Sequence, residues 1–141
     1  MGTEVARTAE VTMRWTGELR FEGGSPGRPP IQVDGDAKVA TSPVELLLLA
    51  AATCSAADIV LILTKQRVSL NALDVAVRGT RRESEPRRYT AIAFHFTVRG
   101  AGADEIKVRR AIDLSLEKYC SVVASLAPDI QISYEVSIPA V

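Results

Sequence analysis

The sequence predicts a single α+β domain over residues 1–141. Short segments with alternating apolar residues occur before, between and after two longer apolar segments, as expected for strands and helices. The predicted order is β-β-β-α-β-β-α-β, which leaves few places for parallel crossovers and therefore favours antiparallel sheets. With 141 residues and a hydrophobic share of 47%, the chain can bury a core without disulfides or a structural metal.

The N-terminal part is expected to form three short strands. Apolar residues alternate with polar ones over 11–15, and the alternation continues over 19–21 after a turn at Gly17. The Gly- and Pro-rich segment 23–30 is predicted to be a loop, because both residue types oppose a regular strand ladder. Residues 31–33 complete the predicted set of strands.

The first long apolar segment has a clear helix start. Ser42 can cap, Pro43 suits the first helical position, and Glu45 completes a capping box with Ser42. The helix is expected to run to about Arg67 with cations in its last turn. It is apolar all round over 46–57, which suggests that a partner subunit covers part of it.

The C-terminal part predicts a hairpin, a helix and a last strand. Residues 73–77 and 92–98 alternate and are separated by a charged turn over 79–88, while 130–138 alternate strictly. Between them a continuous helix is expected over 104–126. Its apolar residues at three- and four-residue spacing are Ile112, Leu116, Tyr119, Val123 and Leu126.

Composition excludes several classes of protein. Seventeen basic and seventeen acidic residues argue against a nucleic-acid partner and an electrostatic membrane anchor. One His and two Cys cannot build a Cys/His zinc finger, so neither a metal nor a cofactor is expected. The segment 46–63 has membrane length, but Asp58 lies within it and a buried core helix is the better interpretation. No targeting segment is visible, so a cytoplasmic location is expected.

Cys54 and Cys120 are the main candidates for chemistry, and each falls within a predicted helix. Free Cys is often simply a small buried hydrophobe. A nucleophilic thiol needs a lowered pKa, which an apolar helix opposes unless a cation is brought to it. The residues alone leave both interpretations open.

The motifs around these two cysteines resemble the OsmC/Ohr family, the osmotically inducible protein C and organic hydroperoxide resistance proteins. The resemblance rests on Ser-Pro-Val-Glu-Leu-Leu-Leu, then Ala-Ala-Thr-Cys54, then Glu-Lys-Tyr-Cys120-Ser, and covers the chain from about Trp15 to the last strand. Within the family the match is closer to the OsmC-like branch, through Cys-x-x-x-Asp58 and Ile-Leu-x-Lys-x-Arg67 at the helix end.

This resemblance implies an OsmC-like fold with antiparallel sheets packed around two central helices in an intertwined homodimer. It also implies roles for the cysteines. In the family's peroxidases the first-helix thiol attacks a hydroperoxide, the second resolves the sulfenic acid as a disulfide, and an external dithiol reduces it. Cys54 matches the first role and Cys120 the second, and a resolving Cys protects a sulfenic acid from further oxidation.

The family's peroxidases also hold an arginine over the reactive thiol, oriented by a glutamate directly after the helix-starting proline. That position is Val44 here, and at about 100° per residue Glu45 lies on the opposite face from Cys54. Arg20 in the N-terminal strands is the first candidate for the arginine, and Arg28 in the following loop is the second.

Asp58 lies one helical turn after Cys54, on the same face. A carboxylate in an apolar helix is expected to have a partner, because an unpaired buried charge is costly. Asp58 could pair with an Arg of a partner subunit, or it could line the site itself, and the sequence leaves both alternatives open.

The function favoured by the sequence is thiol-dependent reduction of organic hydroperoxides by the Cys54/Cys120 pair in a cytoplasmic homodimer. The alternative is a non-catalytic homodimer whose cysteines line a pocket for a small apolar ligand. Expected partners are a second copy, a small-molecule hydroperoxide or apolar ligand, and an external dithiol reductant, without nucleic acid or membrane.

Overall fold

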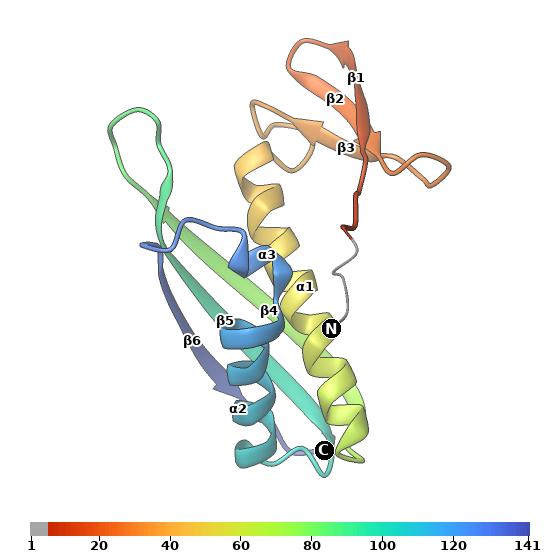
Figure 1. Cartoon of the computed structure of the whole chain (residues 1–141), viewed down its shortest axis with the longest axis vertical. Helices are drawn as coiled ribbons and strands as arrows, with labels where there is room; N and C mark the ends of the chain where they lie inside the picture. Colours follow the sequence, from red (N-terminus) through yellow and green to blue (C-terminus); the bar gives the residue numbers. More distant parts are fainter. Residues whose placement is uncertain (1–5) are drawn as a thin grey trace. The chain divides into compact units, whose positions relative to one another are not determined.

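The computed structural model describes residues 6–141, and the chain divides into two compact units at Leu46/Leu47. The observed elements are three strands, a long helix, two strands, a helical segment and a last strand (Figure 1). This order and the α+β class confirm the prediction from the sequence.

The first unit contains a three-stranded antiparallel sheet in the order β1-β2-β3. Its strands are β1 (Thr12–Gly17), β2 (Arg20–Gly24) and β3 (Ile31–Asp34). β2 extends two residues into the segment predicted to be a loop. Gly23 pairs with Met13 there, and a Cβ at Gly23 would overlap the Thr12 carbonyl oxygen and the Met13 side chain. Only glycine allows the two strands to approach this closely.

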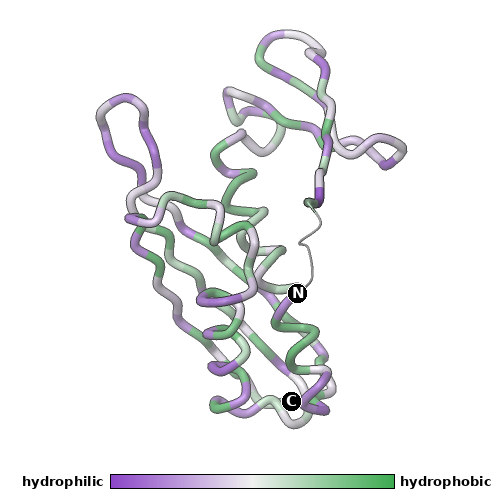
Figure 2. Tube along the Cα trace, viewed as in Figure 1, coloured by the Kyte–Doolittle hydropathy of each residue, from purple (hydrophilic) through white to green (hydrophobic). Residues whose placement is uncertain are grey.

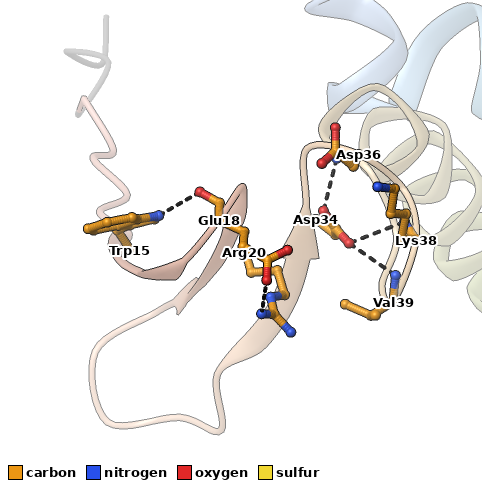
Figure 3. Close-up of polar contacts among 7 residues, drawn as sticks. All are labelled: Trp15, Glu18, Arg20, Asp34, Asp36, Lys38 and Val39. Carbon is orange, nitrogen blue, oxygen red and sulfur yellow. Dashed lines mark hydrogen bonds and ion pairs between the residues drawn. The ribbon is translucent and has the colours of Figure 1, made fainter.

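Asp34 organises the turn that leads from β3 to the long helix. Its buried carboxylate accepts the backbone N–H groups of Asp36, Lys38 and Val39 at 2.9, 3.1 and 3.0 Å (Figure 3). These donors, Val39 first, lower the pKa of Asp34 below its ordinary value because they stabilise the charged form. These three hydrogen bonds therefore fix the backbone of the turn that precedes the helix.

The long helix α1 (Pro43–Lys65) has the predicted ends. Ser42 Oγ accepts the Glu45 N–H at 3.3 Å and Glu45 Oε1 accepts the Ser42 N–H at 3.0 Å, which is the reciprocal capping box. At the other end Arg67 has φ +62°, and the Val68 N–H donates to the Leu63 carbonyl at 3.0 Å. This is a Schellman ending with arginine in the left-handed position usually taken by glycine.

The second unit contains the sheet β4-β5-β6, formed by β4 (Ser69–Arg81), β5 (Tyr89–Ala101) and β6 (Gln131–Ser137). β4 and β5 form the predicted antiparallel hairpin. β6, however, pairs parallel with β5, so the prediction of purely antiparallel sheets is wrong for this strand. The helical segment between β5 and β6 is the crossover that parallel pairing requires.

One face of this sheet is the core. From Ile92 to Gly100 the even-numbered residues of β5 are buried, whereas the odd-numbered ones are exposed or partly exposed. The helices lie against the buried face (Figure 1): the Tyr134 hydroxyl on β6 donates to Asp113, on the helix between β5 and β6, at 2.8 Å, and Leu48 of α1 lies against Gly79. The fully buried large side chains are Ile59, Leu63, Ile92, Phe94, Phe96, Val98, Val108 and Ile112.

The segment predicted to be one helix over 104–126 is interrupted. It consists of α2 (Glu105–Leu114), a π-helical turn η1 (Ser115–Tyr119) and the short helix α3 (Ser121–Ala124). Cys120 lies between η1 and α3 with extended backbone angles, φ −71° and ψ 102°, rather than inside a helix. The Cys120 N–H donates to the Ser115 carbonyl at 2.7 Å, five residues back, and this wider turn ends the α-helical ladder.

α1 is long and apolar enough to cross a membrane by length and composition alone. Five of its residues, Ala51, Ala52, Ser55, Ile59 and Leu63, are buried within the chain. In Figure 2 much of this helix is green, the colour of hydrophobic residues. We conclude that α1 is a partly buried core helix, as the sequence predicted.

Replacing Ser42 by Ala is expected to lower the free energy of unfolding by about 1 kcal/mol, because the N-cap acceptor is lost. Glu45→Gln is the matched control and is expected to cost less, since Gln also accepts the Ser42 N–H. Urea unfolding with an unchanged m-value measures both. Equal stability of Ser42→Ala and the natural protein would contradict the capping assignment.

Candidate functional site

The structure brings the two cysteines together. Cys54 is half-buried in the middle of α1, and Cys120 is buried, with 3% of its surface exposed. Both are free thiols, and Cys54 lies near enough to Cys120 to raise the pKa of its thiol. Two neighbouring free thiols are the arrangement from which a disulfide can form.

The Cys120 thiol is held in its neutral form. Burial raises its pKa from 9.0 to about 11, and the adjacent Cys54 adds to the rise. The backbone N–H groups of Val123 and Val122 act in the opposite direction, because they favour the thiolate. Burial outweighs these donors, so Cys120 carries its proton at neutral pH.

Asp58 has a partner within the same chain. Its Oδ2 accepts a hydrogen bond from the Ser115 hydroxyl at 2.9 Å, and the same hydroxyl lies 3.4 Å from the Ser55 carbonyl oxygen. The partner shown here is therefore a serine of η1, where the sequence left open a cross-subunit arginine or a site role. Ser115 is completely buried, and its hydroxyl joins η1 to α1 one turn after Cys54.

Ser115 is the residue near the thiols that sequence reasoning missed. Its one signal is periodicity: the buried residues Val108, Ala111 and Ile112 lead to position 115 at helical spacing, and a polar side chain there must find a partner. Asp58 on a different helix is that partner, and no local sequence pattern joins the two.

Arg20, the predicted activating cation, lies on β2 in the first unit. Its guanidinium pairs with Glu18 at 3.1 Å, and 43% of its side-chain surface is exposed (Figure 3). It also contributes to the lowered pKa of Asp34. Arg28, the second candidate, is exposed in the loop after β2. A role of either arginine toward the thiols stays a prediction.

Within residues 6–141 no three His, Cys, Asp or Glu side chains are grouped as metal ligands. The described site places two free thiols beside the hydrogen bond between Ser115 and Asp58.

The chain is similar in sequence to known proteins. The family described as OsmC-like protein matches residues 34–135. Protein YhfA of Escherichia coli K12 is 42% identical over 130 residues, which cover 90% of this chain and 97% of YhfA.

Solved structures share the fold. A hypothetical protein from Aquifex aeolicus VF5 superposes with a TM-score of 0.83 and 29% identity, covering 95% of this chain and 99% of the other. The OsmC like protein from Mycoplasma pneumoniae has a TM-score of 0.79 and 19% identity, over 97% and 99% of the two chains.

A more distant structure is that of a protein named for organic hydroperoxide resistance. The organic hydroperoxide resistance protein OhrB of Bacillus subtilis has a TM-score of 0.62 and 18% identity, over 93% and 98% of the two chains, a likeness of fold alone. The family match and the identity to YhfA go further: this chain belongs to the OsmC-like protein family.

Proposed function

We propose that this protein is a thiol-dependent peroxidase that reduces organic hydroperoxides through Cys54 and Cys120. The observation that carries the proposal is the proximity of two free thiols of unequal exposure. The OsmC/Ohr superfamily includes hydroperoxide peroxidases, which supports this class of substrate.

The proposed reaction has two steps in the protein. The Cys54 sulfur attacks one peroxide oxygen, the O–O bond breaks, and the leaving alkoxide takes a proton to become an alcohol. Cys54 is thereby oxidised to a sulfenic acid. The Cys120 sulfur then attacks the Cys54 sulfur, an S–S bond forms, and the departing hydroxide takes the Cys120 proton to become water. An external dithiol restores both thiols.

The unequal environments support this division of roles. Cys54 is more accessible to a peroxide than Cys120, which is 3% exposed. The raised pKa of Cys120, about 11, keeps its proton in place until the hydroxide leaves. A protonated buried thiol is a poor first nucleophile but has the proton that the second step consumes.

Arg20 is the cation that we assign to activation of Cys54, because a nearby positive charge favours a thiolate. Val44 occupies the position at which the family's peroxidases carry the orienting glutamate. Glu18, which pairs with Arg20 at 3.1 Å, provides a carboxylate on the same hairpin for that orienting role.

We further propose that the protein works as a cytoplasmic homodimer. Large apolar side chains are exposed in the chain on β1 and on α1, among them Trp15 at 67% and Leu61 at 62%. The first unit also has an open apolar cavity of about 370 Å³ lined by residues such as Met13, Phe21 and Ile31. Large apolar side chains exposed in numbers are typical of an interface in soluble proteins.

Single cysteine variants test the two roles. Cys120→Ser is expected to consume one equivalent of cumene hydroperoxide and to stop at a sulfenic acid on Cys54, which a dimedone-type probe labels. Cys54→Ser is expected to consume none and to remain unlabelled. Arg20→Met is expected to slow the first step, because the thiolate loses its counter-charge, while leaving the second step unchanged.

Equal residual activity of the two cysteine variants would contradict the roles. Free thiols are also counted in the natural protein before and after one equivalent of hydroperoxide. An unchanged count would favour the alternative, in which the cysteines line a binding pocket for a small apolar ligand.

The raised pKa of Cys120 predicts a pH-dependent stability of the reduced protein. The stabilisation is complete below about pH 9, the ordinary thiol value, and is lost as the pH rises toward about 11, because only the unfolded chain ionises in that range. Cys120→Ala does not show this loss. Between these pH values, the difference in free energy of unfolding between the natural protein and Cys120→Ala therefore changes by at most roughly 1.4 kcal/mol per pH unit. Urea unfolding under reducing conditions measures it, and parallel pH profiles would contradict it.

The dimer is tested by sedimentation. Leu61→Arg is expected to give a monomer or an unfolded chain, because it places a charge on the apolar face of α1. Ile106→Arg is the matched control on α2: Ile106 is 81% exposed in the first turn of that helix, where single exposed apolar residues are common. A natural protein that sediments as a folded monomer at micromolar concentration would exclude the dimer.

A further inference from the structure

Ser115 makes hydrogen bonds toward both cysteines' segments, one through its side chain and one through its backbone. Its buried hydroxyl donates to Asp58 Oδ2 on α1 at 2.9 Å, and its carbonyl accepts the Cys120 N–H at 2.7 Å. Asp58 is one helical turn after Cys54 and shares its face. Through its two hydrogen bonds, Ser115 therefore connects the face of α1 that contains Cys54 with the backbone of Cys120.

The wide turn at Ser115 decides which residue faces α1. Buried positions along α2 follow α-helical spacing from Val108 to Ser115, and an uninterrupted α-helix would next turn Tyr119 inward. The π-helical turn inserts one residue, a rotation of about 100°. Tyr119 is accordingly 51% exposed, whereas Cys120 is only 3% exposed.

We propose that Ser115, held by Asp58, is the positioning residue of the thiol pair: it keeps this wide turn in the register that presents Cys120 to Cys54. The inference rests on the proposed function and assigns Ser115 and Asp58 to its second step. In that step the S–S bond forms and water leaves, with no reactant beyond those already named.

Disulfide formation is sensitive to such positioning. The bond requires a Cα–Cα separation of about 4.4–6.8 Å and a narrow range of torsion angles. If the turn returned to α-helical geometry, Cys120 would rotate away from Cys54 by about 100°, the angle of one helical residue. Loss of the Ser115 hydroxyl removes the contact that holds η1 on α1, while both thiols remain.

Three variants isolate the contact. Ser115→Ala removes the donor, Asp58→Ala removes the acceptor, and Asp58→Asn keeps an acceptor oxygen in place. In Ser115→Ala and Asp58→Ala the rate of disulfide formation after one equivalent of cumene hydroperoxide is expected to fall about tenfold, with dimedone labelling of Cys54 rising in step. The rate of hydroperoxide consumption is expected to stay unchanged, and Asp58→Asn is expected to retain most of the natural rate.

Ser55→Ala is the matched control for removal of a buried serine hydroxyl. The Ser55 side chain lies next to Cys54, is completely buried, and donates only to the Ala51 and Ala52 carbonyls of its own helix at 2.9 and 3.1 Å. It is expected to form the disulfide at the natural rate. Urea unfolding of each variant confirms that the comparison is made between folded proteins.

A second measurement needs no hydroperoxide. The equilibrium constant for the Cys54–Cys120 disulfide is measured against oxidised dithiothreitol, and about a tenfold fall is expected in Ser115→Ala and Asp58→Ala, with the double variant no worse than either. An equilibrium constant and resolving rate in Ser115→Ala equal to those of Ser55→Ala would overturn the inference.

The two assays separate this inference from the proposed function. A natural protein that forms the disulfide with dithiothreitol but ignores hydroperoxides would refute the peroxidase, and the equilibrium constants of the variants would still decide the role of Ser115. A natural protein that forms no Cys54–Cys120 disulfide in either assay would overturn both.

Discussion

The hydrogen bond between Ser115 and Asp58 joins the π-helical turn that precedes Cys120 to the helix that contains Cys54. At 2.9 Å it links a completely buried hydroxyl to a partly buried carboxylate in a helix that is otherwise almost wholly apolar. In such surroundings an unmade hydrogen bond leaves a desolvated polar group without compensation, a cost of about 1–3 kcal/mol. The contact therefore strongly favours one placement of η1 on α1, and the placement of Cys120 follows from it.

Polar groups in this core are few and fully paired. Among the described residues, no buried side-chain nitrogen or oxygen lacks a hydrogen-bond partner. Ser55 bonds back to its own helix, whereas Ser115 bonds across to α1. Two neighbouring buried serines thus have different consequences: one satisfies itself locally, and the other sets the relation between two elements. This difference is the physical reason for using Ser55 as the control.

The thiol pair combines accessibility with protection. Cys54 is half-buried, so it is the thiol that a small oxidant meets first, while Cys120 is kept neutral by burial. In the proposed reaction, a neutral resolving thiol is slow to react with oxidants in solution, yet it lies near the sulfur with which it forms the disulfide. The wide turn supplies this combination, since it buries Cys120 and exposes Tyr119 instead.

Local pattern was sufficient for most elements of the fold. The alternation of β4 and β5, the charged turn between them and both ends of α1 were predicted because strand period, capping residues and turn residues act over a few positions. The motifs around Cys54 and Cys120 also indicate the family to which the chain belongs. These features depend on neighbours in the chain.

Tertiary structure decided the parallel pairing of β6 and the break at Cys120. β6 reads as a strand in either direction, and only the path of α2, η1 and α3 across the sheet sets its orientation. The spacing of apolar residues predicts Tyr119 on the buried face. In the structure, however, the Ser115 hydroxyl bonds to Asp58 on another helix, and the turn after Ser115 is one residue wider than an α-helical turn. Sequence periodicity describes a helix by itself, whereas a buried hydrogen bond between two helices depends on residues far apart in the chain.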